Sequence, residues 1–276
     1  MATYRYVIVD VFTDTPLQGN QLAVFTDARG MPEEQLQPLA REINFSETVF
    51  VYPAEGRGHV RMRIFTPGLE LPFAGHPVLG TAFVLGGPLQ LDELRLETGA
   101  GVVPVRLERD GSRIVFGWMC QPQFSFEPYD RAEELLTLLG VEESGLPVEL
   151  YRQGPGHVLI ELGSAEAVAA LRPDGAALQE LNPYGTACFA RDGETWKARV
   201  FVPAHGVGED PATGSAAGPL ALHLARHGRI SFGEEIEIRQ GVEIGRPSTL
   251  YAVARSPEEV EVGGSAVVVA RGEFRL

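Results

Sequence analysis

Three side chains in this sequence have types and positions suited to moving a proton. Glu47 stands between a helix-like segment and an apolar strand, where a carboxylate can become half-buried. Burial raises a carboxyl pKa toward the range useful for proton transfer, so Glu47 is a candidate acid–base group, although most glutamates at strand starts are solvated. Asp210 lies just before a helical run and is either a functional acid or an acid that complements the helix dipole.

His76, the third side chain, opens a helical run directly after Gly75. The positive end of a helix lowers an imidazole pKa and favours a neutral ring that donates or accepts a hydrogen bond; a histidine that only caps the helix is the alternative. Gly75 and Gly214 lack side chains, and Ser215 follows the second of them. Because a carboxylate can approach the backbone N–H groups of glycine closely, we expect these positions to bind an anion.

These residues belong to a unit that occurs twice. Residues 63–67 and 199–203 are strand-like runs ended by proline, and each is followed by an acidic loop, a Gly–polar pair and an Ala/Leu-rich helical run (77–85 and 216–227). A repeated strand–loop–helix unit predicts a duplicated domain with two helix N-termini facing one cleft. That arrangement suits a small anionic substrate.

The elements between these units indicate an α+β chain. Strands run consecutively between the helices, which favours antiparallel sheets wrapped around helices over a doubly wound parallel fold. The repeat places the domain joint near residue 118. We expect helices at 32–43, 76–86, 130–140, 164–171, 174–181 and 215–227, with Gly86-Gly87-Pro88 as the stop of the second. We expect strands at 4–12, 21–25, 49–52, 60–65, 93–97, 102–108, 113–118, 147–151, 157–162, 184–190, 196–202, 235–239, 249–254, 258–262 and 265–270.

Several other patterns do not predict function. His223 and His227 have the spacing of a zinc pair, but Leu224 stands where a metalloprotease helix carries its glutamate, and no third ligand is evident. We interpret them as histidines stabilised by a helix C-terminus, and we expect no metal. There is no dinucleotide fingerprint, Walker loop or nucleophile elbow, and Lys197, the only lysine, lies mid-strand.

Composition excludes two classes of partner. The 276 residues carry a net charge of −14 without a basic cluster, so neither nucleic acid nor an acidic membrane surface is an expected partner. Only two cysteines are present, Cys120 and Cys188, and the N-terminus reads as a strand without an apolar signal core. A cytoplasmic protein with reduced thiols is the simplest interpretation.

Taken together, the motifs resemble the phenazine-biosynthesis PhzF-like isomerase family over essentially the full length. The likeness rests on residues 9–12, 19–20, 44–47, 65–67, 74–77 and 209–216, and residues 70–76 and 240–248 resemble the phenazine-pathway members in particular. It implies a diaminopimelate-epimerase-like fold: two pseudo-symmetric domains, each a sheet curled around a central helix, with the site between them. It implies a first domain of residues 1–117, joined by the C-terminal strand 264–276, and a second of 118–263.

The resemblance also implies a homodimer without a cofactor and a role for each candidate. Related racemases carry two cysteines before the two key glycines, whereas this sequence has Ala74 and Thr213, so two-base stereoinversion is not expected. The family's pathway members isomerise trans-2,3-dihydro-3-hydroxyanthranilate. By that likeness, the catalytic residues are Glu47, His76 and Asp210, and the substrate-binding residues are Asn20, Ser46, Gly75, Gly214 and Ser215.

In that likeness Glu47 moves a proton from C3 to C1 on one face of the ring, His76 contacts the substrate oxygen and Asp210 holds the amino group. Fixed helix dipoles bind the carboxylate. Two alternatives stay open. The chain could be an isomerase or epimerase of another small carboxylate, or a protein that binds such a carboxylate without turnover.

Overall fold

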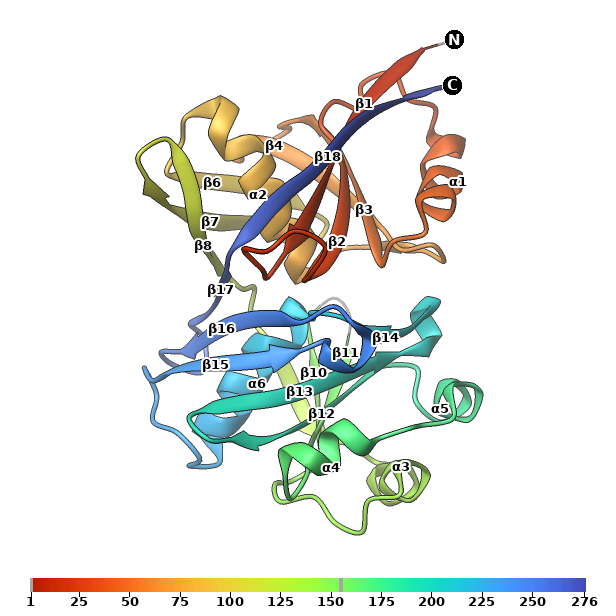
Figure 1. Cartoon of the computed structure of the whole chain (residues 1–276), viewed down its shortest axis with the longest axis vertical. Helices are drawn as coiled ribbons and strands as arrows, with labels where there is room; N and C mark the ends of the chain where they lie inside the picture. The colour runs from red at the N-terminus through yellow and green to blue at the C-terminus, as the bar shows by residue number, and fades with distance from the viewer. Residues whose placement is uncertain (1, 154–155) are drawn as a thin grey trace.

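The computed structural model describes residues 2–153 and 156–276, which form two lobes stacked one on the other (Figure 1). The helices are α1 (Glu33–Ile43), α2 (Gly75–Leu89), α3 (Ala132–Leu139), α4 (Ala165–Ala170), α5 (Gly175–Leu181) and α6 (Gly214–Arg226), with 3-10 turns η1 (Pro203–His205) and η2 (Val242–Ile244). The strands of the N-terminal lobe are β1 (Thr3–Val11), β2 (Asn20–Phe25), β3 (Glu47–Pro53), β4 (Val60–Phe65), β5 (Glu70–Leu71), β6 (Glu93–Thr98), β7 (Gly101–Asp110), β8 (Arg113–Cys120) and β18 (Ala266–Arg275). Those of the C-terminal lobe are β9 (Ser125–Pro128), β10 (Glu149–Arg152), β11 (Gly156–Glu161), β12 (Gly185–Asp192), β13 (Thr195–Val202), β14 (Val207–Asp210), β15 (Glu235–Gln240), β16 (Ser248–Ala254) and β17 (Val260–Gly264).

The two lobes repeat one strand-pairing scheme. In the N-terminal lobe, β2 pairs parallel with β3, β3 antiparallel with β4, and β4 parallel with β6. In the C-terminal lobe the corresponding pairs are β11 with β12, β12 with β13, and β13 with β15, in the same three orientations. Helices α2 and α6 follow the equivalent short strands β5 and β14. The predicted duplication is therefore confirmed.

Each lobe encloses one central helix. In α6 every residue from Gly214 to Ala225 is buried, and α2 is buried over most of its length. A helix that is apolar on all sides must be surrounded by other elements, and the sheets supply that cover (Figure 1). The apolar core runs through both lobes, since one connected cluster of buried side chains includes residues of α2 and α6.

The chain crosses between the lobes twice. β8 leads out of the N-terminal lobe and pairs antiparallel with β17, which leads back. β18 then pairs antiparallel with β1 along the whole length of that strand, from Thr3 opposite Arg275 to Val11 opposite Ala266. We propose that the domain boundary follows these crossings, with residues 1–117 and 264–276 in one domain and 118–263 in the other.

The predicted stop of α2 at Gly86-Gly87-Pro88 is wrong, because the helix continues to Leu89. Gly86 serves packing instead of termination: a Cβ there would lie 2.4 Å from Leu107 Cδ1 on β7. Pro88 lies one residue before the end, so the kink that an interior proline causes can affect only the last residue of the helix. The helix closes at Gln90, whose φ of 53° and N–H bonds to the carbonyls of Gly86 and Gly87 form the cap.

Candidate active site

Four elements from the two lobes converge on one polar cluster. Asn20 begins β2, Glu47 begins β3, His76 is the second residue of α2, and Asp210 ends β14. Asn20 Nδ2 donates across the lobe boundary to Asp210 Oδ1 at 2.8 Å and to the Ala212 carbonyl oxygen at 2.9 Å. Residues separated by 190 positions in the chain thus share a buried hydrogen bond.

Glu47 and His76 form the proton-handling pair. Their closest atoms, Glu47 Oε2 and His76 Nε2, are 3.3 Å apart, and the side chains are 14% and 3% exposed. Burial lowers the pKa of His76 to about 3, which outweighs an opposing effect of the Gln21 backbone. The imidazole is therefore neutral at physiological pH, as the sequence predicts, although the cause is burial and not the helix end; one ring nitrogen can donate a hydrogen bond and the other can accept one.

The pKa values of the two carboxyl groups, Glu47 and Asp210, are both raised. Burial and the negative charge of Asp210 raise the pKa of Glu47 well above its usual value. Burial also raises the pKa of Asp210 to about 6, although hydrogen bonds from Thr213 and Asn20 act to lower it. Two such acids beside a neutral imidazole can take up and release protons near neutral pH.

The raised pKa of Asp210 predicts a pH-dependent cost in stability. Since the folded state holds this proton more tightly than the unfolded state, the free energy of unfolding falls as the pH rises through about 6. Asp210→Asn removes that cost while keeping a side-chain oxygen for Asn20. We expect the variant to be more stable than the wild type at about pH 8, by up to about 3 kcal/mol, with the advantage shrinking below about pH 5. Thermal denaturation across this range measures the difference, and an advantage independent of pH would contradict the explanation.

The N-termini of α2 and α6 meet tip to tip, as the sequence predicts. A Cβ on Gly75 would lie 2.7 Å from the carbonyl carbon and 2.8 Å from the Cα of Gly214, and one on Gly214 would lie 3.2 Å from Gly75 Cα. Real Cβ atoms do not tolerate the shorter of these separations, so Gly75 is required by the approach of the helices themselves. The two tips place the free N–H groups of both first turns in one region.

The serines lie beside these groups. Ser46 Oγ donates to Asn20 Oδ1 at 2.8 Å, which leaves the amide nitrogen of Asn20 for Asp210. Ser215 Oγ lies 2.9 Å from His157 Nε2. Ser46, Glu47, Asp210 and Ser215 line one small pocket of about 30 Å³; its other lining residues are Thr66, Leu71, Ala74, His157, Val202, Val207 and Thr213. The pocket leaves little room for a ring-sized substrate, as is expected where two lobes have closed on a site.

Three residues of the cluster were missed by sequence reasoning as functional groups. Thr213 Oγ1 donates to Asp210 Oδ2 at 2.6 Å. Gln240 Nε2 bonds to the Asp210 carbonyl oxygen at 2.8 Å and to Thr213 Oγ1 at 2.9 Å. The segment 240–248, which carries part of the family likeness, offered a signal for Gln240. His157 had none, because it is an isolated histidine at the start of a strand.

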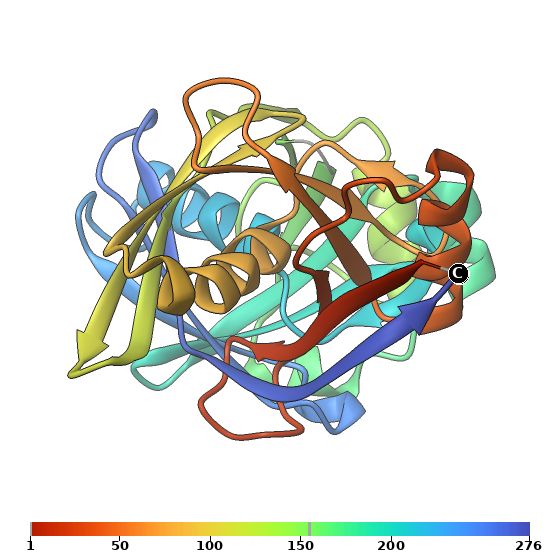
Figure 2. The ribbon, with the colours of Figure 1, turned by 90° about the horizontal axis from the view of Figure 1, so that it is seen from above.

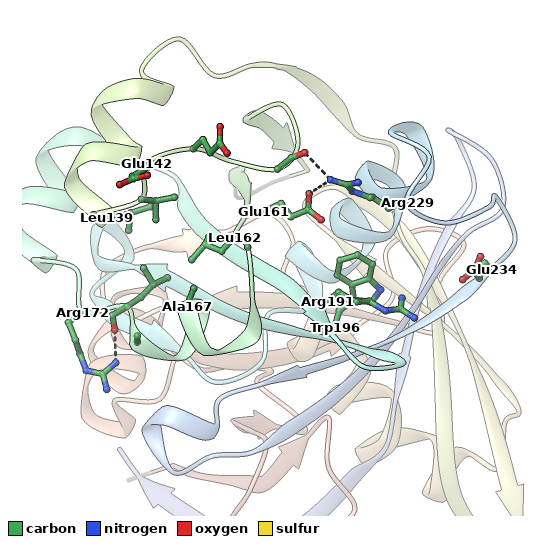
Figure 3. Close-up of a pocket in the computed structure, with 17 residues that line it drawn as sticks. Leu139, Glu142, Glu161, Leu162, Ala167, Arg172, Arg191, Trp196, Arg229 and Glu234 are labelled. Carbon is green, nitrogen blue, oxygen red and sulfur yellow. Dashed lines mark hydrogen bonds and ion pairs between the residues drawn. The ribbon is translucent and has the colours of Figure 1, made fainter.

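A much larger cavity lies elsewhere, in the C-terminal lobe (Figure 3). It measures about 970 Å³ and contains the ion pair of Arg229 with Glu161, 2.7 Å apart, and the side chain of Trp196. No candidate residue from the sequence lines it. Size alone therefore points away from the acid–base cluster, but the raised carboxyl pKa values and the buried hydrogen bond between the lobes lie at Glu47, Asp210 and Asn20.

The cysteines stay outside the site. Cys120 and Cys188 are both free, and burial raises the pKa of Cys188 to about 12, so its thiol is inert. Ala74 and Thr213 stand at the starts of α2 and α6, immediately before the two glycines. Among the described residues, no thiol pair reaches the cluster, which leaves Glu47 as the carboxylate best placed for proton transfer.

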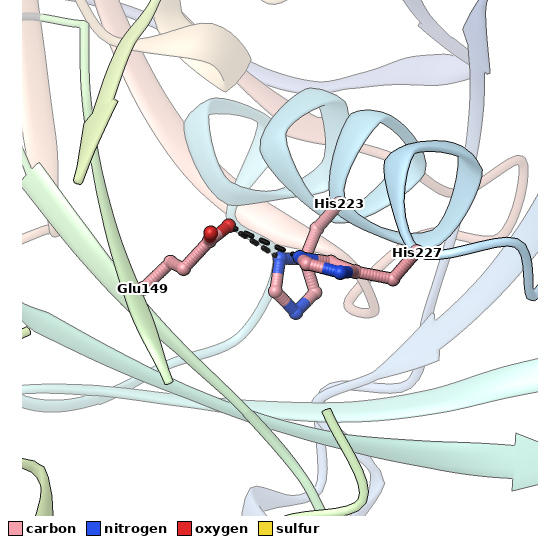
Figure 4. A group of neighbouring side chains, drawn as sticks. All are labelled: Glu149, His223 and His227. Atoms are coloured by element: carbon pink, nitrogen blue, oxygen red, sulfur yellow. Dashed lines mark hydrogen bonds and ion pairs between the residues drawn. The ribbon is translucent and has the colours of Figure 1, made fainter. Parts of the chain in front are cut away.

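His223 of α6 and His227, which caps the helix, have a partner that the sequence did not reveal. Glu149 Oε2 lies 3.2 Å from His223 Nδ1 and 3.3 Å from His227 Nε2 (Figure 4). Arg226 Nη1 already bonds to the same oxygen at 2.6 Å, so a divalent cation there would face a guanidinium charge. The dipole interpretation is wrong for His223, because burial lowers its pKa to about 4 and keeps it neutral.

Comparison with known proteins assigns the class. The sequence model of the family described as phenazine biosynthesis-like protein matches residues 9–272, and the chain belongs to that family. A solved structure of a PhzF-family phenazine biosynthesis protein from Bacillus anthracis superimposes with a TM-score of 0.84 at 28% identity over all of both chains. A hydroxyproline epimerase from Agrobacterium vitis matches with a TM-score of 0.70 at 14% identity, over 99% of this chain and 91% of its own, which reflects the fold alone. The diaminopimelate-epimerase-like fold expected from the sequence is thus confirmed.

Curated relatives of this chain include isomerases named for one substrate. The chain is 50% identical to the trans-2,3-dihydro-3-hydroxyanthranilate isomerase of Pseudomonas aeruginosa, over 99% of this chain and all of the relative. It is 48% identical to the protein of the same name from Pseudomonas fluorescens, with the same coverage. The isomerase class predicted from the sequence is confirmed by these relatives. No helix among the described residues has the length and apolar character needed to cross a membrane.

Proposed function

We propose that this chain is a trans-2,3-dihydro-3-hydroxyanthranilate isomerase of phenazine biosynthesis in which Glu47 carries the proton. The observation that supports this most directly is the placement of the Glu47 carboxyl group. It is largely buried, lies 3.3 Å from a neutral imidazole and faces a pocket that also contains Asp210. Likeness to enzymes of that name over the whole chain supports the choice of substrate.

The reaction needs one base that becomes an acid. Ionised Glu47 removes the proton from C3, the carbon that bears the hydroxyl group, and the double bonds move to C3–C4 and C5–C6. The protonated carboxyl then returns a proton to C1, and the resulting enol becomes a ketone by losing its hydroxyl proton and gaining a proton at C4. The raised pKa of Glu47 suits both steps, since it makes the carboxylate a stronger base and the acid easy to re-form.

The remaining groups bind the substrate and balance its charges. Asp210 accepts a hydrogen bond from the substrate amino group, whose positive charge helps both carboxyl groups to ionise. His76 donates to the substrate oxygen. The N–H groups at the starts of α2 and α6, with Ser215, bind the substrate carboxylate at the positive ends of two helix dipoles. The lobes must separate to admit the ring and close again to exclude water.

Transfer of label distinguishes this mechanism from two-base chemistry. With substrate deuterated at C3, we expect product that carries part of the deuterium at C1, because one carboxyl group both removes and returns it. Proton NMR of the product in ordinary water measures the retained fraction. Complete loss of label, with turnover intact, would count against direct return of the same deuteron, whether a second acid supplies the C1 proton or the Glu47 deuteron first exchanges with water. Binding without turnover would favour the carboxylate-binding alternative.

The coupling of the two acids predicts a shift in the pH profile. Because ionised Glu47 is the base, kcat/KM of the wild type should rise with pH through the pKa of the carboxyl pair and then level off. Asp210→Asn removes the negative charge that raises the pKa of Glu47. We expect its residual kcat/KM to level off at a lower pH than that of the wild type, whatever the loss in magnitude. An unchanged or higher midpoint would contradict the assignment of Glu47 as the base.

Three further properties belong to the same proposal. The enzyme works without a cofactor, since a carboxylate of raised pKa and fixed dipoles supply the chemistry. It forms a homodimer, which light scattering of the purified protein tests. It acts in the cytoplasm, and fractionation of its host tests that placement.

A further inference from the structure

An arginine of the C-terminal lobe forms an ion pair and hydrogen bonds with the N-terminal lobe. Arg246 lies in the connection between β15 and β16, and its Nη2 is 2.7 Å from Asp10 Oδ1 and 2.6 Å from the Gln18 carbonyl oxygen. Its Nε donates to the Gly19 carbonyl oxygen at 2.9 Å. We call Arg246, Asp10 and the carbonyls of Gln18 and Gly19 the clasp.

Two backbone hydrogen bonds accompany the clasp. The Gly19 N–H donates to the Pro247 carbonyl oxygen at 3.0 Å, and the Thr249 N–H donates to the Phe12 carbonyl oxygen at 2.9 Å. Both bonds join one lobe to the other. In the view from above, the loop after β1 lies beside the loop that carries η2, at the lower edge of the molecule (Figure 2).

The clasp is built from buried groups. The Asp10 side chain is 2% exposed and that of Arg246 is 17% exposed. Asp10 Oδ2 also accepts the Leu17 N–H at 2.7 Å, so both carboxylate oxygens are engaged. A buried carboxylate that loses its cation is strongly unfavourable, which makes the closed contact sensitive to Arg246. A lysine cannot replace it fully, because a single ammonium lacks the planar fork that reaches three oxygens.

The segment that carries Arg246 also supports the catalytic acid. Gln240, six residues earlier, bonds to the Asp210 carbonyl oxygen at 2.8 Å. Gly241, with φ 78°, turns the chain between them, and a Cβ there would lie 2.3 Å from the Arg246 carbonyl oxygen and 2.6 Å from that of Pro211. The first residues of the segment therefore fix Asp210, and its end fixes the loop of the other lobe.

That loop leads directly into the site. Gly19, held by Arg246 and Pro247, precedes Asn20, and Asn20 Nδ2 bonds to Asp210 Oδ1 at 2.8 Å. One segment of the C-terminal lobe thus determines where both partners of this hydrogen bond lie. The bond between Asn20 and Asp210 forms only when the lobes are closed, because the two residues belong to different lobes.

We propose that Arg246 is a positioning residue that holds the lobes closed and so keeps Asn20 on Asp210. The inference rests on the proposed function only in taking the closed site as the catalytic one. The pocket at Glu47 is too small for a ring in the closed state, so the clasp must open during each turnover and re-form over the substrate. If the closed state is the one that binds substrate tightly, a smaller closed fraction raises the apparent dissociation constant in proportion.

Arg246→Gln tests this by separating affinity from chemistry. If the closed fraction falls, KM should rise by about 10–100-fold while kcat changes by less than about threefold, because saturating substrate restores closure. Amide hydrogen exchange should accelerate by more than about tenfold at Gly19 and Thr249, whose bonds cross the lobes, and stay unchanged at Ile160 within β11. Arg246→Lys keeps the positive charge but lacks the planar fork, so its KM and its amide exchange rates should lie between those of the wild type and Arg246→Gln.

Two controls identify the pair as the cause. Asp10→Asn should reproduce Arg246→Gln, and the double variant should be no worse than either single one, since both remove one contact. Arg229→Gln breaks an ion pair of the same 2.7 Å length that lies within the C-terminal lobe, and it should leave KM and both amides unchanged. Unchanged KM and unchanged exchange in Arg246→Gln, or equal effects in Arg229→Gln, would overturn the proposal.

A binding measurement keeps this result distinct from the proposed function. In a Glu47→Gln background, the affinity for anthranilate should fall on Arg246→Gln by the same factor as KM rises. This experiment and the amide exchange require no turnover. If the wild type shows no isomerase activity but Arg246→Gln still loses lobe closure, the role of the clasp is supported and the proposed function is refuted. If the wild type is fully active and Arg246→Gln leaves the affinity unaltered, the proposed function is supported and the role of the clasp is refuted.

Discussion

Glu47→Gln is expected to reduce kcat by about 10²–10⁴-fold, the contribution of a positioned acid–base group, while leaving the affinity for anthranilate nearly unchanged. Glutamine has the shape of glutamate and can occupy the same place beside His76, but it takes no proton from carbon. Removing the acid beside Asp210 also relieves the repulsion between the two buried carboxyl groups. The variant should therefore fold at least as stably as the wild type at neutral pH.

Absorbance of the product measures kcat, and calorimetry with anthranilate measures binding. Glu97→Gln is a suitable control, because Glu97 bonds to backbone N–H groups of the 55–58 turn and lies outside the site. Its activity should match that of the wild type. Full activity in Glu47→Gln would refute the single-carboxylate relay. Loss of both turnover and anthranilate binding would mean that Glu47 holds the substrate instead of moving its proton.

Gly75→Ala is expected to prevent the lobes from closing and to lower kcat/KM by at least about 10²-fold. The added methyl group would lie within 2.8 Å of three backbone atoms of Gly214 and Ser215. Those atoms belong to a helix end and cannot move aside as a flexible side chain would. The strain of such overpacking is typically about 1–3 kcal/mol, and lobe separation relieves it at the cost of the bond between Asn20 and Asp210.

Gly87→Ala provides the matched control on the same helix. Nothing lies within 4 Å of a Cβ at Gly87, so the substitution should preserve kcat/KM and add up to about 1 kcal/mol of stability through helix propensity. Steady-state kinetics and thermal denaturation of the two variants make the comparison. If Gly75→Ala kept normal activity, the tips of α2 and α6 would not need to meet during turnover.

Some of this protein could be predicted because the information is local. The alternation of apolar residues located most of the strands, and the repeated strand–proline–acid–glycine unit predicted the duplication and the two helix starts. Three short strands were missed: β5 is two residues long, and β9 and β14 are four each, which leaves hardly any period to detect. β10 is as short as β9 and β14, yet the strand expected at 147–151 includes most of it. The continuation of α2 beyond Gly86 was missed because this glycine is required by packing against Leu107, which lies twenty-one positions away in the sequence.

The sequence by itself determined the kinds of group available: a carboxylate at a helix–strand junction, a histidine at a helix start, an acid and two glycines before helices. Their identities and their places on local elements follow from short-range patterns. Only the tertiary structure decided that Asn20 bonds to Asp210, that Gly75 touches Gly214, and that Arg246 and Gln240 support both sides of the site. These contacts depend on how two duplicated lobes pack, and burial, which sets the pKa values of Glu47 and His76, exists only once they have packed.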